Sequence, residues 1–196
     1  MPDEPTTVSP RQAELLEAAY RYALDHGLTD LSLRPLAAEI GSSPRVLLFL
    51  FGSKEGLVRA LLARARTDEL TLLNRLGPQA GLTEAATRIW EWLSDDQHRP
   101  LLRLWVEAYA RSLVDPTGPW AGFARTTVED WLDVLAACQS PATRSTPQAL
   151  TQRTLTLTIL RGALLDLLAT GDHARTTAAV ARALTLGLLD PADSKP

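Results

Sequence analysis

The sequence has few of the residues from which enzymes and metal sites are built. Its 196 residues contain one cysteine, Cys138, so no internal disulfide can form, and a reducing cytoplasm fits this usage. We expect Cys138 to be a small buried apolar residue. The three histidines, His26, His98 and His173, are far apart and show none of the HxH, HxxxH or HExxH spacings of metal sites. With no GxSxG motif and no phosphate-binding glycine loop, the sequence predicts no enzyme activity, no metal site and no cofactor.

Long apolar runs are also missing. No run approaches the roughly 20 residues that a membrane-spanning helix needs. The segment MPDEPTTVSP at the start is acidic and polar, unlike a secretory signal peptide. We therefore expect a cytoplasmic protein that does not bind membranes, with residues 1–9 as a disordered arm and residues 191–196 as a tail.

The sequence also lacks an excess of basic charge. The net charge of the chain is −3, and the stretch from Arg11 to Arg66 holds 8 basic and 6 acidic residues. A strongly basic domain would favour nucleic-acid binding more clearly. If this stretch binds DNA, it does so through few phosphate contacts, and its affinity should depend only modestly on salt.

What the sequence does contain is a run of three predicted helix starts within the stretch from Ser32 to Leu57. Gly41 can adopt positive φ and end the first short helix, and Pro44 fits the first position of the second. Two short helices around a tight turn are typical of a helix-turn-helix. Each start has a serine that can accept a hydrogen bond from amides one turn later; these serines are Ser32, Ser43 and Ser53.

The second of these helices has apolar residues on both sides. One side is predicted to pack on the first helix, and it consists of Leu47, Leu50 and Phe51. The opposite side holds Arg45, Val46, Leu48 and Phe49, which a short surface helix should not leave in water. Either a DNA major groove or a neighbouring helix covers them. In a groove, Arg45 could reach guanine or a phosphate, and Val46 and Phe49 could contact thymine methyls and sugars.

Lys54 follows Ser53 at the start of the next predicted helix, where the helix dipole disfavours a cation. A cation is favourable there if the helix start approaches a phosphate, which the free amides and the ammonium would bind together. The alternative is a solvated lysine whose charge is offset by Glu55.

Roughly Arg11 to Leu62 resembles the TetR family of transcriptional regulators. The match runs through Leu15-Leu16-x-Ala18-Ala19-x-x-Tyr22, Gly27, Ser32-Leu33-x-x-Leu36-Ala37, Gly41-x-Ser43 and Leu47-x-x-x-Phe51-x-Ser53-Lys54-Glu55-x-Leu57. The sequence departs from the family in the recognition helix. Leu48 stands where the family usually has a tyrosine that meets a phosphate, and Phe49 and Leu50 stand where histidine is frequent.

The resemblance implies an all-helical dimer, with an N-terminal three-helix DNA-binding domain over residues 10–56. A C-terminal bundle, residues 57–190, would bind a small effector and form the dimer. Most members of the family are repressors that the effector releases from DNA. The implied DNA-binding residues are Ser32, Arg34, Ser43, Pro44, Arg45, Val46, Leu48, Phe49 and Lys54.

Beyond residue 80 the apolar pattern predicts helices near 82–94, 99–114, 118–138, 147–170 and 174–189. All five tryptophans lie in this part, and large rings on several helices could line a cavity for an apolar or aromatic ligand. Alternatively, they fill the core of the bundle. The candidate ligand residues are Trp90, Trp105, Tyr109, Trp120, Phe123 and Trp131. Arg103, Glu107 and Arg111, spaced four apart, could orient a polar group of a ligand or form an exposed ion-paired face.

The segment 155–171 is apolar nearly all round, so more than one side of it should be buried. With the last helix it could form a four-helix interface between two copies of the chain. The candidate dimerisation residues are Leu157, Leu160, Arg161, Leu164, Leu168, Val180 and Leu184. A two-fold dimer places two recognition helices about 35 Å apart, on successive turns of a palindromic operator.

The sequence therefore predicts a DNA-binding transcriptional regulator, a homodimeric repressor on double-stranded DNA that a small apolar or aromatic effector releases. The alternative is a helical ligand sensor or protein-interaction module that has lost operator binding. In that case the apolar face around Leu48 and Phe49 would contact a protein.

Overall fold

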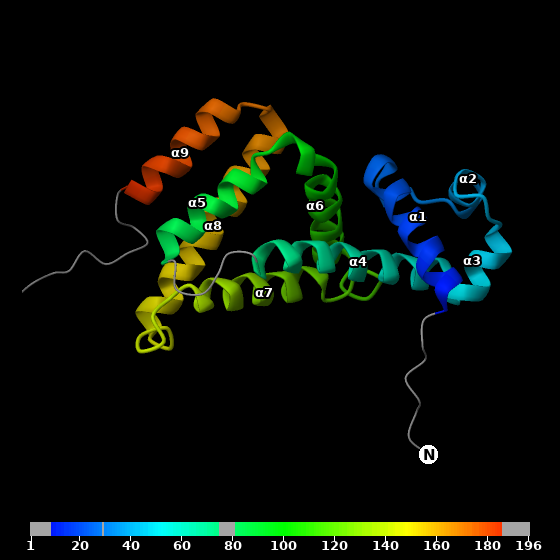
Figure 1. Ribbon diagram of the computed structural model, residues 1–196, viewed down its shortest axis with the longest axis horizontal. Helices are drawn as coiled ribbons and strands as arrows, with labels where there is room; N and C mark the ends of the chain where they lie inside the picture. The colour runs from blue at the N-terminus through cyan, green and yellow to red at the C-terminus, as the bar shows by residue number, and fades with distance from the viewer. Residues whose placement is uncertain (1–8, 29, 75–80, 186–196) are drawn as a thin grey trace, which may run out of the picture.

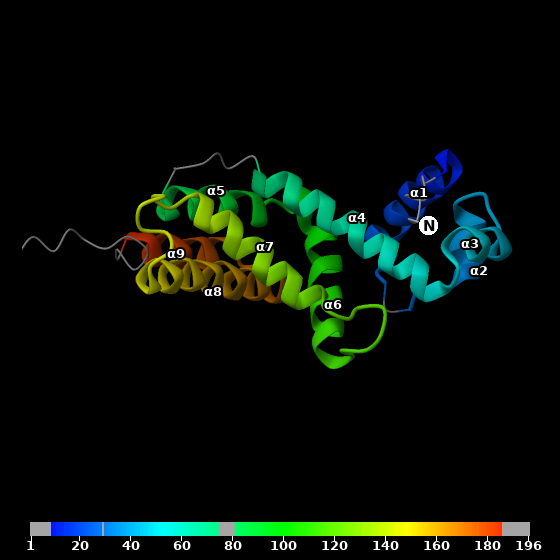
Figure 2. The same ribbon diagram turned by 90° about the horizontal axis from the view of Figure 1, so that it is seen from below.

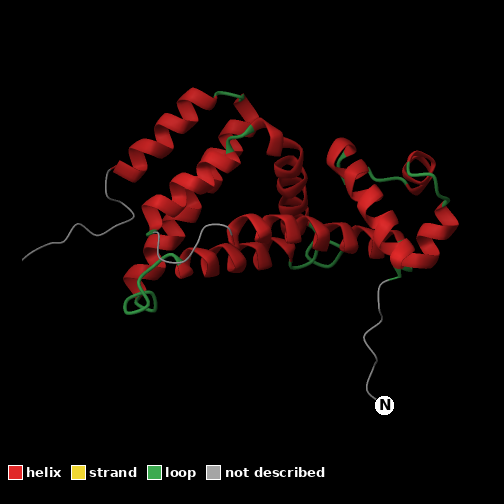
Figure 3. Ribbon diagram, viewed as in Figure 1, coloured by secondary structure: helices red, strands yellow, loops and turns green. Residues whose placement is uncertain are grey.

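The computed structural model describes residues 9–28, 30–74 and 81–185, and within these ranges the chain is helical with no strand (Figure 3). This confirms the predicted all-α class. None of the helices in these ranges is long and apolar enough to cross a membrane. The helices are α1 (Pro10–His26), α2 (Leu33–Glu39), α3 (Pro44–Phe51), α4 (Lys54–Asn74), α5 (Leu82–Leu93), α6 (Arg99–Val114), α7 (Phe123–Ala137), α8 (Pro147–Thr170) and α9 (His173–Thr185), with a short 3-10 turn at Asp96–His98.

The first three helices form a small unit at one end of the molecule, and α4 runs from it into the bundle formed by the later helices (Figure 1). Two of the predicted serine caps are present. The Ser43 hydroxyl accepts the Val46 amide at 3.3 Å, and the Ser53 hydroxyl accepts the Gly56 amide at 3.0 Å. Ser32 precedes α2 without a side-chain cap bond, so that expectation was wrong.

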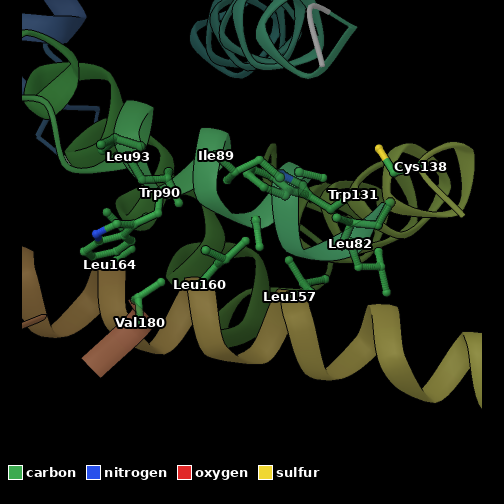
Figure 4. Packing of buried hydrophobic residues seen from close by; sticks show 14 of the residues in the cluster. Leu82, Ile89, Trp90, Leu93, Trp131, Cys138, Leu157, Leu160, Leu164 and Val180 are labelled. Atoms are coloured by element: carbon green, nitrogen blue, oxygen red, sulfur yellow. The ribbon is translucent and has the colours of Figure 1, made fainter. Parts of the chain in front are cut away.

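The N-terminal unit shares its hydrophobic core with the bundle. Leu36, Leu47 and Leu57 are almost fully buried in one cluster, and the same cluster includes Leu104 of α6 and Trp120 from the loop after α6. A second cluster fills the bundle, where Leu157, Leu160 and Leu164 of α8 point toward α5 (Figure 4). Because α6 contributes to both clusters, a change in bundle packing can reach the N-terminal unit.

Helix α4 is tied to its neighbours on both sides by ion pairs. Arg64 donates to Glu17 of α1 at 2.5 Å, and it also pairs with Asp68 one turn further along α4. Arg66 donates through Nε and Nη2 to the two oxygens of Asp130 on α7, at 2.6 and 2.8 Å. Helices α4 and α7 lie side by side in both views (Figures 1 and 2). A shift of α7 is therefore carried to α4.

One predicted helix starts later than expected. The helix predicted over 118–138 begins at Phe123, because Asp115 holds the preceding segment in a turn. Its Oδ1 accepts the backbone amides of Thr117 at 3.3 Å and Gly118 at 3.0 Å. The other predicted bounds lie close to the observed ones. The arm before residue 9 and the segment after residue 185 lie outside the described residues.

Candidate functional site

The outward face of α3 is open. Phe49 is 86% exposed, Leu48 41% and Val46 39%, whereas Leu47 between them is 1% exposed. The described part of the chain therefore leaves the Phe49 ring uncovered, and the alternative in which Phe49 packs on a neighbouring helix of its own chain does not hold. A large apolar side chain on a surface helix needs a partner from outside the chain.

Three cations lie on α3 and on the two helices that pack against it. Arg34 on α2, Arg45 on α3 and Lys54 at the start of α4 are all exposed. None of the three takes part in an ion pair among the described residues. Unpaired cations beside an apolar helix face suit a polyanion with apolar groove edges. Of the other candidates, Ser32 is exposed, and Ser43 and Pro44 are half-buried at the start of α3.

Contacts with α1 and with the N-terminal core fix the position of α3. Leu47 is buried in the N-terminal core, and Gln12 of α1 donates its side-chain amide to the Leu50 carbonyl at 2.9 Å. The chain then turns sharply at Gly52, whose φ is +78°. Packing, a hydrogen bond to α1 and a fixed turn together set the direction in which Phe49 points.

A carboxylate of the chain itself already accepts a hydrogen bond at the start of α4. The carboxylate of Glu55 accepts hydrogen bonds from its own backbone amide and from the Ser53 hydroxyl, which lowers the pKa of Glu55. An ionised carboxylate there competes with a phosphate for the free amides. Lys54 thus offers its ammonium to an anion, while the amides beside it are shared with Glu55.

The bundle contains an apolar cavity of about 30 Å³, which is room for about one or two water molecules. Its described lining comes from α4, α5, α6, α7 and α8. Two of the six predicted ligand residues, Trp105 and Trp131, line it. The full lining is Ala65, Trp92, Leu93, Leu101, Leu102, Trp105, Trp131, Leu157, Leu160, Arg161 and Leu164.

The other four predicted ligand residues lie elsewhere. Trp90 donates its indole N–H to the Thr177 hydroxyl at 3.0 Å and joins α5 to α9. Tyr109 is tilted against Trp105, with ring centroids 5.1 Å apart, next to the cavity. Trp120 belongs to the N-terminal core, and Phe123 packs between both cores.

Sequence reasoning did not include Trp92 among the candidate ligand residues, and it assigned Arg161 to a dimer interface. Trp92 stacks on His98, with ring centroids 4.1 Å apart, and lines the cavity. The Arg161 guanidinium lies 4.9 Å from the Tyr109 ring centroid and 5.9 Å from that of Trp105. The signal that could have found Arg161 is its position as a basic residue within a mostly apolar segment that was predicted to be buried on more than one side.

Most of the predicted dimerisation residues lie inside the chain's own bundle. Leu157, Leu160, Leu164 and Val180 are at most 6% exposed. Helices α5, α7 and α9 of the same chain pack on α8 and cover these apolar side chains. These four side chains are therefore not available to a second copy. Leu168 and Leu184 are half-buried against the same core, and Leu150 and Leu165 are the exposed large apolar residues of α8.

The comparisons with known proteins agree with this arrangement. Residues 15–61 match the sequence model of a family described as bacterial regulatory proteins, tetR family, which confirms the resemblance found in the sequence. The sequence matches none of the curated proteins with which it was compared.

Solved structures share the fold over nearly the whole chain. A transcriptional regulator from Rhodococcus sp. Rha1 has a TM-score of 0.76 at 21% identity, over 94% of this chain and 98% of that one. GusR from Salmonella enterica has a TM-score of 0.68 at 20% identity, over 95% and 99%. The multidrug binding protein EbrR, solved with imidazole, has a TM-score of 0.67 at 23% identity, over 98% and 96%.

Proposed function

We propose that this chain, a TetR-family protein by its N-terminal domain and its fold, is a transcriptional repressor that binds a palindromic operator as a homodimer. Residues 10–56 would form the DNA-binding domain, and residues 57–190 would bind a small effector and the second copy. Such a regulator acts in the cytoplasm, where the operator DNA lies.

One observation carries the DNA-binding proposal, namely the 86% exposed Phe49 ring on the outward face of α3. The ring is fixed in direction by the buried Leu47 and accompanied by the unpaired Arg34, Arg45 and Lys54. In a major groove the ring can contact thymine methyls while the cations contact phosphates. The recognition would rest more on apolar contacts than on hydrogen bonds.

The effector proposal rests on the position of the cavity. Ala65 of α4 lines it, and α4 leads directly into the DNA-binding unit. Since the cavity has a volume of only about 30 Å³, any small molecule that enters must displace lining side chains and helices. A ligand that binds only the expanded arrangement shifts the population toward it. The same shift would turn α4 and change the spacing of the two recognition helices in a dimer.

The outer surface of α8 and α9 supports the dimer. Gly162 and Leu165 of α8, and Ala178 and Ala181 of α9, are exposed. Small and apolar side chains on two adjacent helices allow close packing against the same pair of a second copy. Sedimentation at micromolar concentration tests this part, and a monomer there would contradict it.

A gel shift with genomic fragments at low salt tests the main proposal. Wild-type protein should retard fragments that contain a palindrome, and the Phe49→Ala variant should lose this selectivity. If no fragment is retarded, the alternative is favoured, a helical sensor or protein-interaction module whose Phe49 face contacts a protein. Binding that is equal for all fragments would also contradict an operator-specific repressor.

A further inference from the structure

We propose that the bundle cavity binds an organic anion, a small carboxylate on an aromatic or apolar body, and that Arg161 binds its carboxylate. The inference rests on the proposed function and names the chemical class of its effector. It starts from a charged side chain placed at an apolar cavity without a counterion.

Arg161 has unused hydrogen-bond donors. Its Nη1 donates to the Tyr109 hydroxyl at 3.1 Å, but its Nε and Nη2 are buried and have no hydrogen-bond partner in the described structure. The indole N–H of Trp105, which lines the same cavity, is also buried without a partner. Buried donors are normally satisfied, and an unpaired one costs about 1–3 kcal/mol, more when it is charged. A ligand that accepts hydrogen bonds from these donors should therefore bind more tightly than one whose polar group meets donors that are already paired.

The two unused nitrogens of Arg161 are the pair that binds a carboxylate side-on. Nε and one terminal nitrogen form a planar fork that matches the two oxygens of a carboxylate. Arg66 of the same protein shows this geometry. Its Nε and Nη2 hold the two oxygens of Asp130 at 2.6 and 2.8 Å. In Arg161 the equivalent edge has no partner.

No side chain of the cavity supplies the counterion. The described lining contains neither aspartate nor glutamate. The Tyr109 and Trp105 rings lie within cation–π range of the guanidinium, and such contacts offset only part of the desolvation of a charge. A ligand anion completes the compensation, whereas a cationic ligand would be repelled.

The remaining walls determine the body of the ligand. Trp92, Trp105 and Trp131 present rings, and leucines from α5, α6 and α8 fill the space between them. Flat aromatic or short aliphatic groups suit such a surface. Because the present cavity holds about 30 Å³, these side chains must separate when the body enters, which links occupancy to the position of α4.

Calorimetry and tryptophan fluorescence with three matched probes test the inference on the full-length protein. Phenylacetate carries the carboxylate, phenylacetamide is its neutral counterpart, and phenethylamine its cationic counterpart. We expect phenylacetate to bind wild-type protein about tenfold more tightly than the amide, as one charge-assisted bidentate pair would give. The amine should bind most weakly.

Variants assign the preference to Arg161. Arg161→Met keeps most of the side-chain volume and should bring phenylacetate down to the affinity of the amide, while the amide itself binds unchanged. Arg161→Lys keeps the charge without the fork and should lose part of the preference. The matched control is Arg153→Met on the same helix, since Arg153 donates to Gln139 and to the Arg144 carbonyl outside the cavity. This control should leave the preference intact.

Equal affinity for acid and amide, tighter binding of the amine, or no binding of phenylacetate at millimolar concentration would overturn the inference. So would a preference for the acid that survives in Arg161→Met. The acid–amide comparison in wild-type protein decides the matter even if that variant fails to fold. None of these measurements needs DNA, so acid binding without any retarded DNA fragment would refute the repressor and leave the anion site standing.

Discussion

The carboxylate of Glu107 on α6 accepts the backbone amide of Leu28, with Oε1 at 3.1 Å and Oε2 at 3.0 Å. The bond lies where α1 has just ended, and a Cβ on Gly27 would come within 3.0 Å of the same carboxylate. An ionised acceptor makes this a strong hydrogen bond. It joins α6 of the bundle to the N-terminal unit at the point where α1 ends.

Replacing Glu107 by glutamine should therefore weaken the contact between α6 and the end of α1. The amide has one acceptor oxygen and no charge, so we expect a loss of about 1–2 kcal/mol in the free energy of unfolding. Urea unfolding followed by circular dichroism measures it. The control is Glu129→Gln on α7, whose pair with Arg125 is exposed and should be worth less than about 0.5 kcal/mol. Equal losses in both variants would contradict a special role for Glu107.

The opposite faces of α3 predict opposite effects of truncation. Phe49→Ala removes an 86% exposed ring, so stability should change by less than about 0.5 kcal/mol. Affinity for the operator should fall by about tenfold or more, because both recognition helices of a dimer lose an apolar contact. Leu47→Ala, at a side chain 1% exposed, should cost about 2–5 kcal/mol of stability. A Phe49 variant that unfolds early yet binds DNA normally would reverse this assignment.

The salt dependence of DNA binding follows from the exposed cations. With Arg34, Arg45 and Lys54 on each of two protomers, the slope of log affinity against log salt should be no steeper than about −5. Lys54→Gln should reduce its magnitude by about 2 per dimer and weaken all sequences alike. Arg125→Gln removes a cation on α7 that is paired with Glu129, and it should leave the slope unchanged. A much steeper wild-type slope would mean that other cations contact phosphates.

Local signals allowed most of the helices to be predicted, because Ser-Pro and Thr-Pro starts and glycine stops act within one turn. Thr146 and Pro147 begin α8, and Gly171 ends it with a φ of +69°. The start of α7 was wrong because Asp115 holds a turn that apolar spacing does not show. Helical geometry placed Leu48 and Phe49 on other sides of α3 than Leu47, but it left open whether DNA or a neighbouring helix covers them.

Contacts between distant residues were the part that the sequence could not specify. Glu107 sits in a series of alternating charges that could equally have formed an exposed face, and only the fold brings it to Leu28, 79 residues away. Likewise, the apolar run of α8 indicated burial but not which chain covers it. Arg161 was therefore placed in a dimer interface, although it lies against Tyr109 of its own bundle.

Tyr20 links α1 to α4 through a hydrogen bond whose contribution to folding stability depends on pH in the alkaline range. Its hydroxyl donates to Asp68 at 3.0 Å, and burial together with this carboxylate raises the pKa of Tyr20 above its usual value of 10. The unfolded chain thus releases the proton at lower pH than the folded protein does. The contribution of Tyr20 is complete below about pH 10 and is lost as the pH rises further.

The difference in urea midpoint between wild type and Tyr20→Phe isolates this effect, since every other titrating group is common to both proteins. Wild type should be the more stable at neutral pH, and its advantage should shrink above about pH 10. An advantage that stays constant into the alkaline range would mean that the phenol does not keep its proton in the folded protein.

Two glycines in helices should respond oppositely to alanine. At Gly56, in the first turn of α4, an added Cβ would lie 2.0 Å from the Phe51 carbonyl oxygen. Because that atom belongs to the backbone at the end of α3, the two helices would have to separate. Gly56→Ala should therefore cost about 2 kcal/mol or more, despite the roughly 1 kcal/mol that alanine gains over glycine in a helix. Thermal unfolding of the pure variant measures the net effect.

At Gly162, in α8, a Cβ would meet nothing within 4 Å in the single chain. Gly162→Ala should therefore stabilise the protomer by up to about 1 kcal/mol. In the proposed dimer this glycine lies on the face where two copies of α8 approach each other, and the added methyl should weaken association even as the protomer becomes more stable. Sedimentation and unfolding of this one variant thus separate the two effects. A gain in stability with undiminished dimerisation would place the dimer interface on another face of the bundle.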